Sequence, residues 1–342
     1  VIQKRAMHRA IAVVLLIWSV GYSISPAPPV KWISAFDNVI VRTIHDVEPL
    51  PDGGYIAVGE ATASEQEPSR CVVVRVSAAG SIEWSRAFNY GDSSGFTRVK
   101  RLVDGSLVIA GTYRQSGCRY AVVQKLFADG SESWRRTVEE CGATSADIGV
   151  TPDGFMLVTN NPLAPEEIAL HRISSDGEIV QQWRFGTPGV DVVSALHCES
   201  DGRSVLVGST SLIEGGSMDG FVLGLDSAGS VRWAQVLGDA LHDDSVLCID
   251  AVGPNRYVVA GVTSSTGIPL SSNAFVAALD SASVSWAALY GGEGSESVCD
   301  IFSTGAGGFV LAGSTGSVSD EQHRQAFILQ GRIGGDVEWL AL

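Results

Sequence analysis

The sequence predicts an all-β protein of the β-propeller class, with six blades of four strands as the favoured arrangement. The first observation is a period, because seven of the eight tryptophans recur at intervals of about 50 residues. The second is that each interval contains four short apolar segments separated by turn residues, without helical periodicity, which is typical of one propeller blade. The repeated tryptophans are Trp32, Trp84, Trp134, Trp183, Trp233, Trp286 and Trp339.

Residues 1–25 have the three-part form of a secretory signal. Basic side chains precede an apolar run at 11–20, and small side chains follow it. The apolar run is shorter than the about 20 residues that a membrane-spanning helix needs. We therefore expect a signal peptide, with an uncleaved N-terminal anchor as the alternative. The remaining residues, 26–342, are expected to form a single propeller domain.

The segment 30–36 resembles one tryptophan-containing strand without the rest of its repeat. We expect this strand to close the ring of blades. Seven tryptophan strands compete for six outer positions, so the strand of Trp32 or that of Trp339 takes the outer place in the last blade, or both pack there. Seven blades are the alternative, which we disfavour because the first strand has no partners of its own. The expected blades span about 37–88, 89–138, 139–187, 188–238, 239–291 and 292–342.

Each repeat has the same internal order of strands and turns. A first strand leads through an Asp-Gly type of turn, which supplies a positive φ, into an apolar second strand that ends in glycine, as at 204–208. Nearly continuous apolar runs indicate strands buried on both faces. Two repeats depart from the pattern: the third has Thr159 in place of the glycine, and the last hairpin turn of the fifth, within 280–284, contains no glycine.

The tryptophan ends the last hairpin of each repeat and is expected to be structural. A large side chain fills the space between neighbouring blades, and its indole N–H can donate to a nearby carbonyl. We therefore exclude the seven tryptophans from the search for functional residues.

Two hairpins, 76–84 and 225–233, resemble the tryptophan-docking hairpins of the propellers named after pyrroloquinoline quinone. Together with 52–59 and 289–292, they are more similar to secreted bacterial β-propeller repeat proteins. The resemblance covers residues 30–342 and implies the propeller fold and a secreted or surface location. It implies no activity, because one fold hosts unrelated chemistries. The quinone-binding and calcium residues of the quinone enzymes are not located in this sequence, so no cofactor is predicted.

Six cysteines follow the apolar N-terminal run, and export would permit disulfides. If Asp129 and Gly130 form a two-residue turn, Cys118 and Cys141 face each other across the last hairpin of the second blade, within bonding reach. We predict a disulfide there. The pairing of the other four is open, and the three that occur in first strands are expected to be buried free thiols. These four are Cys71, Cys198, Cys248 and Cys299.

Acidic side chains gather in the loops expected at one face of the propeller, and we take them as the binding candidates. Calcium is an option at Asp219, Asp243 and Asp244, because it prefers clustered oxygen ligands, although no contiguous Asp-x-Asp loop occurs. No Cys-x-x-Cys or paired-His spacing predicts another metal site. The candidate binding residues are Asp219, Asp243, Asp244, Glu293 and Glu296.

The formal net charge of −15 disfavours nucleic-acid binding, which needs basic side chains to neutralise phosphates. No nucleophile elbow, phosphate loop or Ser/His/Asp grouping appears, so no catalytic residues are assigned. The prediction is a non-enzymatic, extracytoplasmic binding or scaffold propeller, secreted, periplasmic or at the cell surface, that recognises a protein or glycan through one loop face.

Two alternatives stay open. One is an extracytoplasmic hydrolase or lyase with an axial active site, which two carboxylates, or a His with a carboxylate, meeting in one axial cleft would favour. The other is a subunit of an outer-membrane assembly.

Overall fold

The computed structural model describes residues 40–62, 67–164, 167–211, 216–239, 241–264, 271–305, 307–317 and 324–342. The expected signal peptide at 1–25, the expected closing strand at 30–36 and Trp32 lie outside the described residues. In the part of the chain that is described, no helix is long and apolar enough to cross a membrane.

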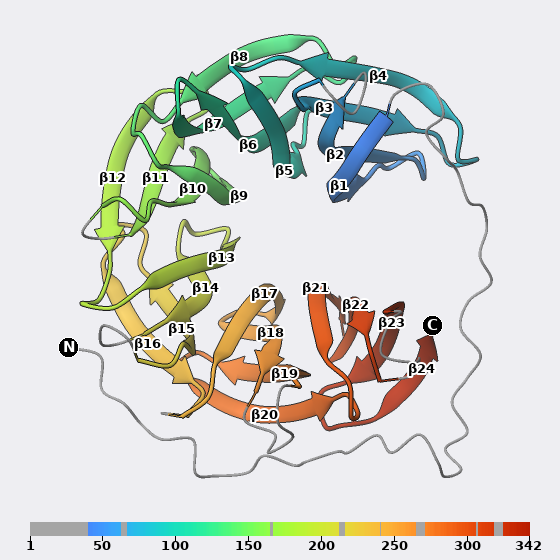
Figure 1. Ribbon diagram of the computed structural model, residues 1–342, viewed down its shortest axis with the longest axis vertical. Helices are drawn as coiled ribbons and strands as arrows, with labels where there is room; N and C mark the ends of the chain where they lie inside the picture. Colours follow the sequence, from blue (N-terminus) through green and yellow to red (C-terminus); the bar gives the residue numbers. More distant parts are fainter. Residues whose placement is uncertain are drawn as a thin grey trace. The chain divides into compact units, whose positions relative to one another are not determined.

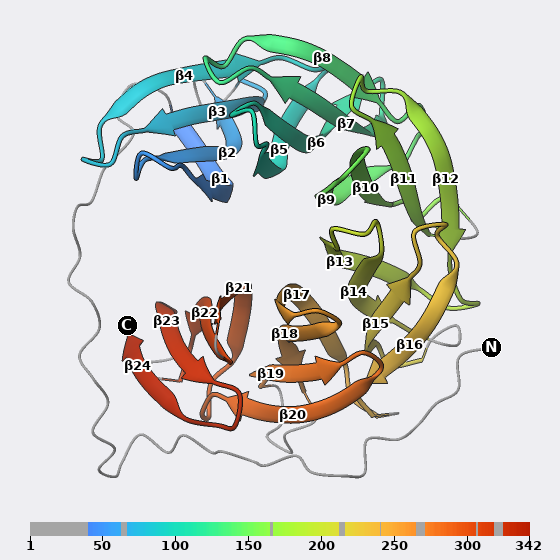
Figure 2. The same ribbon diagram turned by 180° about the vertical axis from the view of Figure 1, so that it is seen from behind.

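The described residues form six antiparallel sheets of four strands, each ordered as in the sequence (Figures 1 and 2). The predicted all-β propeller fold with six blades is confirmed. The first three blades contain β1 (Ile40–Pro49), β2 (Tyr55–Thr62), β3 (Arg70–Val76), β4 (Ile82–Phe88), β5 (Ser93–Arg101), β6 (Leu107–Gln115), β7 (Cys118–Leu126), β8 (Glu132–Thr137), β9 (Thr144–Thr151), β10 (Gly154–Asn160), β11 (Ile168–Ser174) and β12 (Ile179–Phe185). The last three contain β13 (Asp191–Cys198), β14 (Ser204–Thr210), β15 (Asp219–Leu225), β16 (Val231–Leu237), β17 (Asp244–Gly253), β18 (Arg256–Thr263), β19 (Asn273–Asp280), β20 (Ser283–Tyr290), β21 (Glu296–Gly305), β22 (Gly308–Thr315), β23 (Gln325–Arg332) and β24 (Val337–Ala341).

The blades belong to two compact units. Blades 1–3 form the N-terminal unit within residues 29–186, and blades 4–6 form the C-terminal unit within residues 187–342. In blade 6, β24 is the fourth strand and carries Trp339, so all four of its strands come from the last repeat.

The first strand of every blade contains a β-bulge, which the sequence pattern does not predict. The bulge lies opposite the position where most second strands have glycine, and those strands continue past the glycine. The backbone approaches the second strand so closely there that a Cβ on Gly208 would lie 2.0 Å from the carbonyl oxygen of Val192. This contact explains the repeated glycine, because any side chain would overlap the backbone. Blade 3 has Thr159 instead, whose hydroxyl lies 3.0 Å from Nε2 of His171. The six bulge residues are His45, Thr97, Ala146, Ser194, Leu247 and Cys299.

The last hairpin of most blades turns through three residues rather than the expected two. In blade 2 the amide of Phe127 donates to Ser131 O, and Gly130 has a φ of 82°, which glycine adopts readily. The fifth blade differs, as its sequence predicts: Asp280 pairs directly with Ser283, and Ser281 takes the positive φ, 52°.

Within each unit, apolar clusters span neighbouring blades, and a tryptophan of the earlier blade lies at each junction. Trp134 packs against Phe155 of the next blade with ring centroids 5.9 Å apart, and its Nε1–H donates to Ser175 O at 3.0 Å. Trp233 contacts Tyr257 and Trp286 contacts Phe309 in the same way. The indoles therefore join the sheets.

The predicted disulfide is present, with Cα atoms of Cys118 and Cys141 5.1 Å apart. The turn between the two strands differs from the expectation, because it has three residues rather than two. A bulge at Ser133 compensates, so that Lys125 pairs with Trp134 and the expected register is restored towards the cysteines.

The four other cysteines form no disulfide, but only Cys71 and Cys248 are buried. Burial raises the pKa of the Cys71 thiol to about 12 and keeps it protonated. The expectation of buried thiols is wrong for Cys299, which is exposed because it is the bulge residue of its strand, and Cys198 is only half-buried. Cys198, Cys248 and Cys299 also occupy three different register positions.

Candidate ligand-binding pocket

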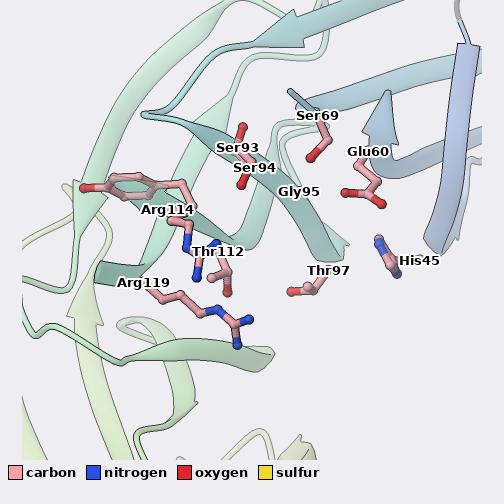
Figure 3. Close-up of a pocket in the computed structure, with 11 residues that line it drawn as sticks. His45, Glu60, Ser69, Ser93, Ser94, Gly95, Thr97, Thr112, Arg114 and Arg119 are labelled. Atoms are coloured by element: carbon pink, nitrogen blue, oxygen red, sulfur yellow. The ribbon is translucent and has the colours of Figure 1, made fainter. Parts of the chain in front are cut away.

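A polar pocket of about 250 Å³ lies where blades 1 and 2 of the N-terminal unit meet (Figure 3). Its charged lining residues are His45, Glu60, Arg114 and Arg119, and its hydroxyl groups come from Ser69, Ser93, Ser94, Thr97 and Thr112. Gly95 and Tyr113 complete the lining. The pocket therefore combines both signs of charge with a hydroxyl-rich wall.

Local backbone geometry brings these residues together. His45 and Thr97 are the bulge residues of β1 and β5, so they leave the regular alternation of their strands. Glu60 directly follows the close-approach glycine of β2, Gly59. Arg114 and Arg119 lie near the tight turn between β6 and β7, on the two strands that it joins.

No ion pair within the described residues compensates the charges of the two pocket arginines. The side chains of Arg114 and Arg119 are exposed and form no ion pair with any other described residue. The half-buried Glu60 carboxylate likewise accepts no hydrogen bond within the described part of the chain. Figure 3 shows the two guanidinium groups on one side of the pocket and Glu60 with His45 on the other. A ligand entering this pocket meets two cations that are free to pair.

The hydroxyl wall is held by contacts with neighbouring strands. Oγ1 of Thr112 accepts from the amide of Ser145 at 2.9 Å, and Oγ of Ser94 accepts from the amide of Cys71 at 3.2 Å. Oγ1 of Thr97 lies 3.3 Å from Oγ of Ser145. The Thr97 hydroxyl already donates to a backbone carbonyl at 3.3 Å. A hydroxyl that only accepts a bond can still donate one, so Thr112 and Ser94 are pre-organised for a ligand with acceptor oxygens.

An aromatic side chain borders the same pocket. Tyr113 stacks on Tyr120 with ring centroids 5.4 Å apart and lies 6.1 Å from Tyr90. Tyr90 is fixed by its hydroxyl, which lies 2.7 Å from Oε1 of Gln124. These contacts leave Tyr113 half-buried and its position well defined.

The disulfide supports the cationic side of the pocket. Cys118 directly precedes Arg119, and Cys141 lies in the loop between β8 and β9. The amide of Gly142 donates to Arg119 O at 2.9 Å. A covalent link and a backbone hydrogen bond thus hold the Arg119 backbone against this loop.

None of the predicted acidic binding residues lines this pocket, because all five belong to the C-terminal unit. The structure brings Asp219 and Asp244 together at Gly238 and buries both. Glu296 is also buried, whereas Glu293 is exposed. Asp243 accepts from the amide of Met218 at 2.9 Å. Three of the five are therefore buried, whereas Asp243 and Glu293 are exposed.

Two of the five acidic residues occupy blade positions equivalent to a position beside the pocket. The amides of Ser94, Asp244 and Glu296 make equivalent hydrogen bonds to the residue preceding a third strand, so these three positions correspond. In the N-terminal unit the position holds a serine beside the pocket. The sequence signal that could have found the pocket is the pair of arginines around the β6–β7 turn, in a chain with 38 acidic and 23 basic side chains. Within the described residues, no three His, Cys, Asp or Glu side chains cluster as a metal site would require.

No protein-family model and no curated protein matches the chain. Solved structures are similar to it in fold. Sqt1 from Chaetomium thermophilum aligns with a TM-score of 0.51 and 10% identity over 86% of this chain and 83% of its own. The β-propeller domain of the trilobed protease from Pyrococcus furiosus, described as having an open velcro topology, aligns with a TM-score of 0.52 and 9% identity over 86% and 82%. Puromycin hydrolase aligns with a TM-score of 0.52 and 14% identity over 85% of this chain but 45% of its own. Identities this low show the propeller fold alone.

Proposed function

We propose that the chain is an extracytoplasmic binding propeller that recognises an acidic glycan in the pocket between blades 1 and 2. The observation that carries the proposal is the pair Arg114 and Arg119, which form no ion pair within the described residues and lie beside a hydroxyl wall. A guanidinium group binds a carboxylate through two parallel hydrogen bonds, and such charge-assisted bonds are about twice as strong as neutral ones. A uronate sugar supplies that carboxylate.

The other lining groups match the remaining chemistry of such a sugar. Ring hydroxyls both donate and accept, and the hydroxyls of Thr97 and Thr112 can bond to them. The carboxylate of Glu60 accepts from sugar hydroxyls, and the ring of Tyr113 offers an apolar face. The net charge of −15 repels polyanions elsewhere, so a local cationic site favours binding in one place.

Extracytoplasmic location is the second part of the proposal. The disulfide between Cys118 and Cys141 is typical of oxidising compartments. The signal-like pattern at 1–25 and the resemblance to secreted bacterial propeller-repeat proteins support the same location. A partner glycan at the cell surface is consistent with it.

The test is a binding screen with acidic and neutral oligosaccharides of equal length. We expect tetragalacturonate to bind and maltotetraose not to bind. Replacing both pocket arginines (R114A/R119A) should weaken tetragalacturonate binding at least tenfold, whereas R232A, which removes an exposed arginine of β16, should not. Equal binding of both sugars, or equal loss in the two variants, contradicts the proposal.

A lyase or hydrolase acting at the same pocket is the second candidate, because His45 and Glu60 both line it. A lyase needs a base near the sugar and a cation on its carboxylate, and both kinds of group are present. Incubating the protein with polygalacturonate separates the candidates: new ultraviolet absorbance indicates elimination and new reducing ends without it indicate hydrolysis. A binding protein produces neither.

A further inference from the structure

The pocket between blades 1 and 2 carries opposite charges on opposite sides. The guanidinium groups of Arg114 and Arg119 lie on one side (Figure 3). The carboxylate of Glu60 lies on the other side, near His45. Within the described residues, the arginines form no ion pair and the Glu60 carboxylate accepts no hydrogen bond. A ligand therefore meets both signs of charge in one small space.

The Glu60 carboxylate is open to this space. Glu60 lies in β2, paired with Thr43 of β1 and Cys71 of β3, and its side chain is half-buried. Gly95 of β5 lies beside it, and a Cβ at this position would lie 3.6 Å from Oε2 of Glu60. Because Gly95 has no side chain, nothing at that position covers the oxygen. Half-burial also removes part of the water that would otherwise solvate the charge.

A ligand that carries only negative charge satisfies one side of this pocket and opposes the other. Arg114 and Arg119 attract its carboxylate, but Glu60 repels any further anionic group and finds only neutral hydroxyls to bind. A protonated amino group offers three hydrogen-bond donors, and hydrogen bonds between ions are stronger than neutral ones. The charges therefore favour a ligand with one carboxylate and one ammonium group.

The size of the pocket limits how far apart these two groups lie. Its volume of about 250 Å³ is below the range of about 300–1,000 Å³ that is usual for ligand pockets. One sugar ring fits this space more readily than several, so both groups should belong to one sugar. In a 2-amino uronate the carboxylate is attached to C5 and the amino group to C2, at opposite corners of the ring.

We propose that the pocket selects an amino sugar acid, whose carboxylate binds the two arginines and whose protonated amino group binds Glu60. The inference rests on the proposed function and narrows the acidic glycan to one that carries a positive charge on the same sugar. His45, beside Glu60, can accept from the same amino group through a ring nitrogen when the ring is neutral. Glu60 then determines specificity, whereas Arg114 and Arg119 supply the affinity common to all uronates.

The test is calorimetric titration at about pH 7, where an amine with a pKa of about 8 is mostly protonated. The ligands are the methyl glycosides of 2-amino-2-deoxygalacturonate, of its N-acetyl derivative, of galacturonate, and of galactosamine, which lacks the carboxylate. The first and third differ only in an amino group in place of a hydroxyl. The wild type should bind the amino uronate about fivefold or more tighter than each of the other three.

Two variants assign the preference to Glu60. E60Q keeps the size of the side chain and removes its charge, so the ratio of the affinities for the amino uronate and the galacturonate should fall to about one. R114A/R119A should weaken the binding of both uronates. The control is E293Q, which changes an exposed glutamate of the C-terminal unit and should keep the wild-type ratio.

Tetragalacturonate separates failure of the inference from failure of the proposed function. If neither it nor any of the uronates binds the wild type, the proposed function fails and the inference fails with it. If tetragalacturonate binds but the amino uronate binds no tighter than the galacturonate, or if E60Q keeps the preference, only the inference is overturned. The comparison of these two glycosides on the wild type needs no variant, so it decides even if E60Q does not fold.

Discussion

His171 makes the stability of the chain depend on pH in a calculable way. The imidazole lies in β11, 1% exposed, with Nε2 3.0 Å from the Thr159 hydroxyl and no partner for Nδ1 among the described residues. Burial lowers the pKa of His171 from 6.5 to about 4, so the ring is neutral in the folded chain at pH 7. The unfolded chain regains the ordinary pKa and binds a proton more readily. Falling pH therefore favours unfolding.

The size of the effect follows from the pKa difference. A pKa difference of one between the folded and unfolded chain corresponds to about 1.4 kcal/mol of stability. Lowering the pKa of His171 from 6.5 to about 4 therefore reduces the free energy of unfolding by about 3 kcal/mol at low pH. The loss begins as pH falls through 6.5, grows down to about pH 4 and is constant below it. Above pH 7 the group contributes nothing to the pH dependence.

The assay is urea unfolding of the wild type and of H171Q between pH 8 and pH 4, followed by tryptophan fluorescence. The wild-type free energy of unfolding minus that of H171Q should be constant above pH 7 and fall by about 3 kcal/mol by pH 4. M156L, a neutral change in the adjacent strand β10, should give the same difference from wild type at every pH. If the wild-type–H171Q difference were flat, or rose as pH fell, the pKa of His171 would not be lowered in the folded chain.

Three further predictions concern the fold and its link to the pocket. In chemical denaturation, G208A should lower the free energy of unfolding by about 3 kcal/mol or more, because the added Cβ would lie 2.0 Å from Val192 O. G253A should change it little, because a Cβ added there has no atom within 4 Å. Equal effects of the two substitutions would contradict the close approach at Gly208. G177A should lower the free energy of unfolding by more than about 1 kcal/mol. The added Cβ would lie 2.7 Å from the Trp134 ring, and residue 177 has a φ of 87°, which favours glycine. An unchanged thermal midpoint would argue against packing of the indole on this turn. The free energy of unfolding of C118S/C141S should be about 3 kcal/mol lower than that of the wild type, because the disulfide closes a loop with a sequence separation of 23. The double variant should also bind tetragalacturonate more weakly, because Arg119 loses its support. Full affinity in the folded variant would show that the disulfide does not position the arginine.

Much of the fold could be predicted because its causes are local and repeated. The tryptophan period, the apolar second strands and the Gly-containing turns each occur several times in register. The disulfide followed from register alone, although two departures, a longer turn and the bulge at Ser133, had to cancel.

The bulges were missed because their signal is indirect. The repeated glycine of the second strand, as at Gly208, marks a close approach that only the neighbouring first strand reveals. Without the bulge, His45 and Thr97 are ordinary strand positions, and nothing in the sequence separates them from their neighbours.

The pocket was missed for the same reason. Its residues run from His45 to Arg119 and come from two blades, so their meeting depends on how sheets pack rather than on spacing. The many acidic residues made the loop carboxylates the obvious candidates from the sequence. The sequence does not show which of them are buried: Glu296 is buried, whereas Glu293 is exposed.

The arginines of the blade 1–2 junction are expected to bind a carboxylate-bearing sugar. Calorimetric titration with tetragalacturonate at low and high salt compares the wild type, R114A/R119A and R232A. The wild type and R232A should bind alike, with affinity falling as salt rises, and R114A/R119A should lose at least tenfold in affinity together with most of the salt dependence. Identical binding curves for the wild type and R114A/R119A would contradict this role of the arginines.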